Sequence, residues 1–85
     1  MHGEAVYMKT LIEFVAKSLV DDPTEVHVSE ETYGRDIHVS LKVAEEDMGR
    51  VIGRNGRVAN AMRALMRVAA ARQGLRSTLD INQNG

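Results

Sequence analysis

The spacing of the apolar residues alternates between helical and strand periods along this 85-residue chain, and the order of these periods constrains the fold. Asp22 precedes Pro23, and a residue before proline avoids the helical region. We therefore predict a first helix over 8–19, ending before this pair. Its apolar stripe follows the 3.6-residue period: Met8, Leu11, Ile12, Val15 and Leu19.

Two segments of alternating apolar and polar residues follow, as expected for strands with one apolar face. Gly34 lies between them and marks a turn. A tight loop at Tyr33-Gly34 predicts a hairpin whose apolar faces lie together. The predicted pairs are Val26 with Leu41 and Val28 with Val39.

A short and a long helix follow the hairpin. Three acids favour the start of the short helix, because carboxylates complement the positive end of the helix dipole: Glu45, Glu46 and Asp47. Gly53 ends this helix, and the long helix runs from about Gly56 to Gly74. The predicted buried stripe of the long helix is Val58, Ala61, Met62, Leu65 and Ala69.

A last strand over 77–81, with Leu79 and Ile81 facing inward, completes the order α-β-β-α-α-β. The stretch between the last two strands is long enough for a crossover, so we expect these strands to be parallel. The predicted fold class is α+β, a three-stranded mixed sheet with three helices on one face. The length fits one domain, at 8–82, with a flexible N-terminal extension over 1–7 and a tail over 83–85.

Charge is divided unevenly between the two parts of the chain. Residues 1–48 hold eleven acids and four bases, a net charge of −7, whereas residues 49–85 hold seven arginines and one acid, a net charge of +6. The arginine-rich part suits an anionic polymer, although a solvated helix face explains the same arginines. The chain has no cysteine and no apolar run near the ~20 residues that span a bilayer, so we predict a soluble cytoplasmic protein.

Two glycines three residues apart separate the two consecutive helices, in Val51-Ile52-Gly53-Arg54-Asn55-Gly56-Arg57. In structural terms, Gly53 can adopt positive φ at a helix end, and Gly56 can relieve a tight entry into the next helix. In functional terms, neither residue carries a Cβ, so a sugar-phosphate backbone can approach the main chain. The N–H groups at the start of the second helix attract phosphate, and Arg50, Arg54 and Arg57 add positive charge.

Catalytic and metal-binding chemistry finds little support in the sequence. No Ser/His/Asp or Cys/His set can be assembled, so we predict no enzyme and no cofactor. His27 and His38 could share the open sheet face, with Glu25 and Asp36 as conceivable oxygen ligands. Exposed strand histidines are the ordinary explanation, so we predict no metal site.

The α-β-β-α-α-β order and the glycine turn resemble a type II KH domain, whose GxxG loop clamps four backbone nucleotides of single-stranded RNA. Residues 8–23 and 41–53 are similar to the small bacterial single-KH-domain proteins of the KhpA type. The resemblance covers about residues 8–82 and implies a cytoplasmic RNA-binding protein, regarded as an RNA chaperone and post-transcriptional regulator. It also implies a link to cell elongation and cell-wall homeostasis, and association as a homodimer or with a larger Jag-type KH protein. Two departures are the additional residues 1–7 and a short hairpin loop.

The resemblance places RNA at the glycine turn. Gly53 and Gly56 would admit the RNA backbone, while Arg54 and Asn55 would face solvent or phosphates. Lys42 would line the wall opposite the turn. Val51, Ile52 and Val58 would floor an apolar groove for bases, or would instead be plain core residues. The expected RNA-binding residues are Lys42, Arg50, Val51, Ile52, Gly53, Arg54, Asn55, Gly56, Arg57 and Val58.

Three interpretations stay open at this point. Arg63 and Arg67 lie opposite the predicted buried stripe and fit a solvated face or a protein contact better than direct RNA contacts. A DNA-binding helix-turn-helix, with its reading helix starting at Gly56, is one rival function. A KH-shaped protein-interaction module without RNA binding is the other.

Overall fold

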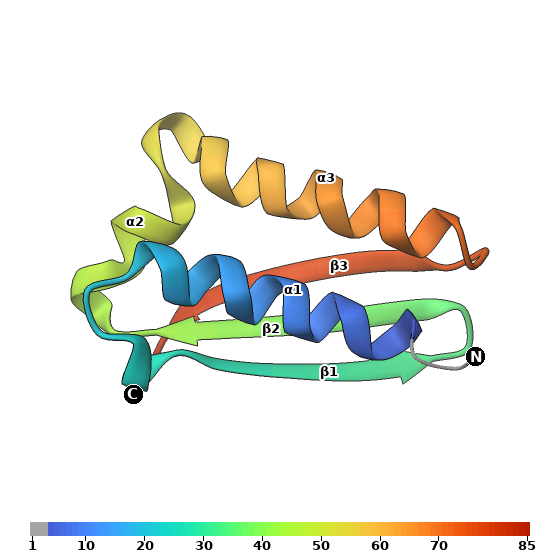
Figure 1. The fold of residues 1–85 in the computed structure, drawn as a ribbon, viewed down its shortest axis with the longest axis horizontal. Helices are drawn as coiled ribbons and strands as arrows, with labels where there is room; N and C mark the ends of the chain where they lie inside the picture. The colour runs from blue at the N-terminus through green and yellow to red at the C-terminus, as the bar shows by residue number, and fades with distance from the viewer. Residues whose placement is uncertain (1–3) are drawn as a thin grey trace.

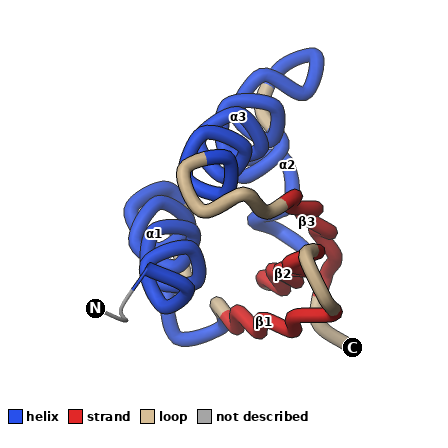
Figure 2. Tube along the Cα trace, turned by 90° about the vertical axis from the view of Figure 1, so that its right-hand side faces the viewer, coloured by secondary structure: helices blue, strands red, loops and turns tan. Residues whose placement is uncertain are grey.

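In residues 4–85, which the computed structural model describes, three helices cover one face of a three-stranded sheet (Figure 1). Figure 2 shows this layering end-on, with the helices on one side of the strands. The elements are α1 (Glu4–Leu19), β1 (His27–Tyr33), β2 (Asp36–Val43), α2 (Met48–Ile52), α3 (Arg57–Ala71) and β3 (Arg76–Gln83). Short 3-10 turns precede β1, α2 and α3: η1 (Pro23–Glu25), η2 (Glu45–Asp47) and η3 (Arg54–Gly56). The predicted fold class is confirmed.

The sheet has β2 at its centre, antiparallel to β1 and parallel to β3, as predicted for the last two strands. The predicted hairpin register is wrong by two residues, because Val28 pairs with Leu41. The cause is the loop: Tyr33 pairs with Asp36, so the two loop residues are Gly34 and Arg35. Glycine at the first position of a two-residue loop is the type II′ preference. A shift of two residues leaves every side chain on its predicted face.

The core lies between the helices and the inner face of the sheet, and the predicted stripe of α3 is only partly right. Met62 is buried, but Ala61 and Leu65 are exposed. The fully buried positions of α3 are Ala59, Met62, Met66 and Ala70. The reason is that α3 contacts both the sheet and α1, and Leu65 lies on the side toward α1.

Both ends of the fold extend beyond their predicted limits. The helix α1 begins at Glu4, within the predicted extension, and residues 1–3 lie outside the described residues. At the other end, β3 includes Gln83, and the backbone N–H of Asn84 donates to Val43 O at 2.9 Å. The predicted tail is therefore largely part of the sheet. No helix within residues 4–85 is long and apolar enough to cross a membrane.

Candidate functional site

The loop between α2 and α3 depends on an unusual backbone at Gly53. This residue has φ 79° and ψ 169°, a combination that essentially only glycine adopts. A Cβ at this position would lie 2.5 Å from Val58 Cγ2 and 2.8 Å from the Val58 backbone nitrogen. Backbone conformation and packing both require glycine here, which confirms the prediction of positive φ at the end of the short helix.

Gly56 is required for its backbone alone. It is left-handed at φ 75°, yet a Cβ would meet only Asn60 Nδ2, at an ordinary 3.8 Å. Asn55 is left-handed as well, at φ 58°, a conformation that asparagine tolerates. Two hydrogen bonds close the turn, from Gly53 N–H to Gly49 O at 2.8 Å and from Gly56 N–H to Gly53 O at 3.1 Å.

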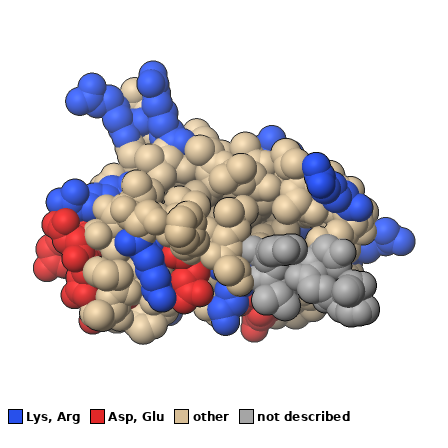
Figure 3. All heavy atoms as spheres, viewed as in Figure 1, with Lys and Arg blue, Asp and Glu red and all other residues tan. Residues whose placement is uncertain are grey.

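The outer surface of this loop is positively charged. Arg54, Asn55 and Arg57 are all exposed, and Figure 3 shows basic side chains projecting from the region between α2 and α3, at the upper left. No side chain within the described residues caps the N-terminus of α3. The positive end of the α3 dipole and the arginines therefore point to the same place, where an anion is stabilised.

Arg50, predicted to join this cluster, is instead held in ion pairs. Its Nη2 lies 2.9 Å from Asp21 Oδ2, and its Nε lies 3.2 Å from Asp47 Oδ1. Two carboxylates balance this guanidinium, so we remove Arg50 from the expected phosphate contacts.

Asp47 is the functional residue that sequence reasoning missed, since it was interpreted only as part of an acidic first turn. Its side chain is 2% exposed and accepts hydrogen bonds from the backbone N–H groups of Asp21 (3.0 Å) and Asp22 (3.2 Å). These contacts, the bond from Asp21 first, outweigh burial and lower the pKa of Asp47 below its usual value, with help from Arg50. The carboxylate therefore ties the start of α2, which carries the glycine loop, to the segment after α1.

Two further predicted contacts are corrected by burial and strand parity. Val51 is 0% exposed, so it is a core residue and cannot touch a base. Lys42 alternates with the buried Leu41 and Val43 on β2, the central strand, so it faces the open side of the sheet, away from the helices. Its predicted place in the wall of the groove is wrong.

Ile52 and Val58 remain at the loop. Ile52 is 36% exposed, whereas Val58 is half-buried and packs against the core beneath Gly53. Ile52 is thus the accessible apolar side chain of the predicted groove floor.

A groove of about 360 Å³ lies between α3 and β3, which is the free edge strand of the sheet. It is lined by Arg63, Met66, Arg67, Ser77, Thr78, Leu79 and Asp80. Arg63 Nη2 donates to Leu79 O at 3.1 Å. Arg63 and Arg67 were interpreted as a solvated face, but the structure places them in this groove. Their spacing of four residues on one helix face was the signal available in the sequence.

The histidines do not form a shared site. His27 lies opposite Lys42 in the sheet and His38 lies opposite Glu31, four positions further along β2. His38 Nδ1 instead lies 2.9 Å from Thr78 Oγ1. Over the part of the chain that the structure describes, no group of three or more His, Cys, Asp or Glu side chains is placed to hold a metal ion.

Comparison with known proteins agrees with this architecture. The family model of the KhpA/KhpB KH domain matches residues 9–81. This chain belongs to that family. Its relatives include the RNA-binding protein KhpA of Clostridium acetobutylicum, 51% identical over 74 residues, which are 87% of this chain and 99% of the relative. The RNA-binding protein KhpA of Halalkalibacterium halodurans is 49% identical over 87% of this chain and 97% of its own length.

Solved structures show the same KH fold within a larger protein. Aquifex aeolicus Era bound to GDP and AlF4− matches 94% of this KH domain with a TM-score of 0.67 and 15% identity. Era in complex with MgGDPNP and nucleotides 1506–1542 of 16S ribosomal RNA matches 93% with a TM-score of 0.61 and 14% identity. This chain spans only 31% and 30% of those two chains. At such low identity the likeness shows the fold alone.

Proposed function

We propose that this KH domain binds single-stranded RNA in the cytoplasm, with phosphates at the loop from Gly53 to Gly56 and bases in the groove between α3 and β3. The observation that carries the proposal is the glycine loop itself: it removes two Cβ atoms beside an uncapped helix N-terminus among the described residues. The relatives named RNA-binding protein KhpA support the same function.

Arg54 and Arg57 supply the phosphate contacts in this proposal. Both are exposed, and within the described residues no carboxylate lies within ion-pair distance of either, unlike Arg50. Guanidinium groups bind phosphate through charge-assisted hydrogen bonds. Backbone N–H groups at the start of α3 add donors at the same point.

The groove between α3 and β3 supplies the base contacts. The outer edge of β3 presents backbone donors and acceptors, and Arg63 and Arg67 place two guanidinium groups beside it. Bases of single-stranded RNA are read on their polar edges and stack on guanidinium planes. Ile52 adds an exposed apolar side chain near the loop.

The structure favours RNA over the rival helix-turn-helix. The helix α2 has only five residues, little more than one turn, so it is short for the helix that crosses a DNA backbone. Arg63, which would read the major groove, is instead hydrogen-bonded to the edge of β3.

Salt dependence and competition test the proposed function. We expect fluorescence anisotropy with a labelled single-stranded RNA to give a slope of log K against log[salt] near −2 to −3, at about 0.7 counterions per phosphate contact. Duplex DNA of the same length should compete poorly. A flat salt dependence, or equal affinity for duplex DNA, contradicts the clamp at the glycine loop.

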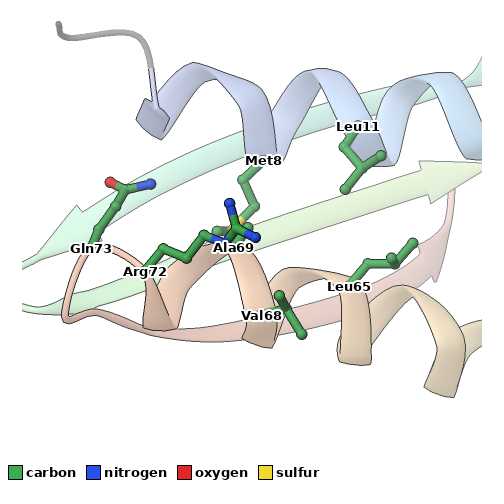
Figure 4. Close-up of a pocket in the computed structure, with 7 residues that line it drawn as sticks. All are labelled: Met8, Leu11, Leu65, Val68, Ala69, Arg72 and Gln73. Atoms are coloured by element: carbon green, nitrogen blue, oxygen red, sulfur yellow. The ribbon is translucent and has the colours of Figure 1, made fainter.

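We also propose that the domain forms a homodimer through an apolar groove between α1 and α3 (Figure 4). The groove measures about 590 Å³ and is lined by Met8, Leu11, Leu65, Val68, Ala69, Arg72 and Gln73. Leu65 is 48% exposed and Val68 is 60% exposed, although both are large and apolar. Burial of such side chains against a second copy removes apolar surface from water.

Sedimentation tests the homodimer. We expect a species larger than 9.4 kDa at micromolar concentration, and Leu65→Glu should shift the population to monomer while RNA still binds. A wild-type protein that sediments only as a 9.4 kDa species contradicts self-association. A larger Jag-type KH protein is the second partner that the resemblance suggests, and it is tested by adding that protein to the same experiment.

The physiological part of the proposal is a role as an RNA chaperone and post-transcriptional regulator in cell elongation and cell-wall homeostasis. Crosslinking in cells, followed by sequencing of the bound RNA, tests it directly. Bound transcripts without any connection to envelope growth would contradict that role while leaving RNA binding intact.

A further inference from the structure

Arg63 reaches across the groove from α3 to β3. Its Nη2 donates to Leu79 O at 3.1 Å in a partly buried contact. Met66 and Leu79, the apolar part of the groove, are buried beneath it. The guanidinium thus occupies the middle of the surface on which a base would lie.

Strand geometry shows which backbone groups of β3 face this groove. Arg76 N–H donates to Arg35 O at 2.8 Å, and Asn84 N–H donates to Val43 O at 2.9 Å, so the even-numbered residues point these groups toward β2. Because backbone groups alternate along a strand, Ser77, Leu79 and Ile81 point theirs to the free edge. Leu79 O is the acceptor at the centre of that edge, and Arg63 already engages it.

We propose that Arg63 makes this groove selective for the keto bases uracil and guanine over the amino bases cytosine and adenine. The inference rests on the proposed RNA binding. A guanidinium has five N–H donors and no acceptor, and Arg63 spends one of them on Leu79 O. The others suit a carbonyl oxygen such as uracil O4 or guanine O6. An amino group at that place sets donor against donor, because the carbonyl that would accept it is in use.

The position of Arg63 fits a strand held at the glycine loop. Arg63 is seven residues after Gly56, about 10 Å along the axis of α3. Asn60 and Arg67 lie on the same helix face, three residues before and four residues after it. A KH loop clamps about four nucleotides, so a base next to the clamped phosphates reaches this guanidinium.

Two pairs of oligoribonucleotides of equal length isolate the keto and amino groups. Uridine and cytidine oligomers differ at position 4 of the pyrimidine, and inosine and adenosine oligomers differ at position 6 of the purine. We expect wild-type protein to bind the keto member of each pair at least about fivefold more tightly by anisotropy. Equal affinities within both pairs would overturn the selectivity.

Variants then assign the selectivity to Arg63. Arg63→Met keeps an unbranched apolar stem, removes every donor and releases Leu79 O, so the uridine-to-cytidine ratio should fall to about one or invert. Arg63→Lys, which keeps the charge but not the planar set of donors, should lower the ratio while keeping the salt slope. Arg67→Met is the matched control from the same groove: it should weaken both oligomers equally and keep the ratio.

The outcomes separate this inference from the proposed function. Thermal melting by circular dichroism shows that each variant is folded. A ratio unchanged in both Arg63 variants overturns the inference while RNA binding stands. A folded wild-type protein that binds none of the four oligomers overturns both.

Discussion

Replacing the two central loop residues, Arg54→Asp with Asn55→Asp, separates phosphate binding from folding. Both side chains are exposed, and Gly53 and Gly56 are left in place, so the positive-φ backbone of the turn is kept. Aspartate, like asparagine, tolerates the left-handed conformation that Asn55 adopts at φ 58°.

The expected effects on stability and on binding differ in size. Exposed substitutions of this kind change the free energy of unfolding by no more than about 0.5 kcal/mol, and a carboxylate near the start of α3 adds a small favourable dipole interaction. Binding loses one cation and gains two anions where phosphate sits. Since one charge-assisted hydrogen bond contributes about 1.5–3 kcal/mol, RNA affinity should fall at least tenfold, about 1.4 kcal/mol. The salt slope should shrink by about 0.7 for each phosphate that the variant no longer neutralises.

The assay compares this variant with Lys9→Glu plus Thr10→Glu, which changes the net charge by the same three units. Lys9 and Thr10 are exposed on α1, near the opposite end of the molecule from the glycine loop (Figure 1). The control should keep most of the RNA affinity, because its charges are far from the clamp. If the folded loop variant binds RNA as tightly as wild type, or the control loses as much affinity, the glycine loop is only a structural turn.

Three further substitutions test the fold around the site. Gly53→Ala should destabilise the protein by at least about 2 kcal/mol in urea denaturation, because its Cβ meets Val58 as well as straining the backbone, whereas Gly56→Ala should cost only about 1–2 kcal/mol. Asp47→Asn should lower Tm at pH 7; because the folded pKa of Asp47 is depressed, its contribution is complete above the unfolded value of about 3.9 and is lost as pH falls through the folded pKa, so the Tm gap between variant and wild type should close in acid. Asn84→Ala should cost about 1 kcal/mol in the same denaturation assay, since its amide donates to Glu25 O at 2.7 Å. Equal stabilities for the two glycine variants, a Tm gap that widens in acid, or an unchanged urea midpoint for the Asn84 variant would each contradict the interaction concerned.

Local patterns predicted the elements well, because periodicity and glycine placement are properties of neighbouring residues. The hairpin register depended on which residue begins the turn, and Gly34 in the first loop position moved every pair by two. The rotation of α3 was ambiguous because its apolar residues, Leu65 and Val68 as well as Met62 and Met66, extend around more than one face. Only packing against α1 decides between them.

The site was harder to predict because its key contacts join distant parts of the chain. Asp47 binds backbone groups 25 and 26 residues away, and Arg50 pairs with Asp21 across 29 residues. Nothing in a local motif indicates such partners. Lys42 was a different error: its alternation with Leu41 and Val43 already placed it on the face opposite the helices.

The position of β3 at the edge of the sheet has a consequence for solubility. An unpaired edge strand is a template for a strand from another molecule and hence a risk of aggregation. In this protein Arg63 covers the central carbonyl of the edge, and Arg67 lines the same groove. Two copies that approached edge to edge would bring four guanidinium groups together, and their repulsion opposes the pairing. The arginines beside β3 therefore protect the protein from self-templated aggregation whenever no nucleic acid covers that edge.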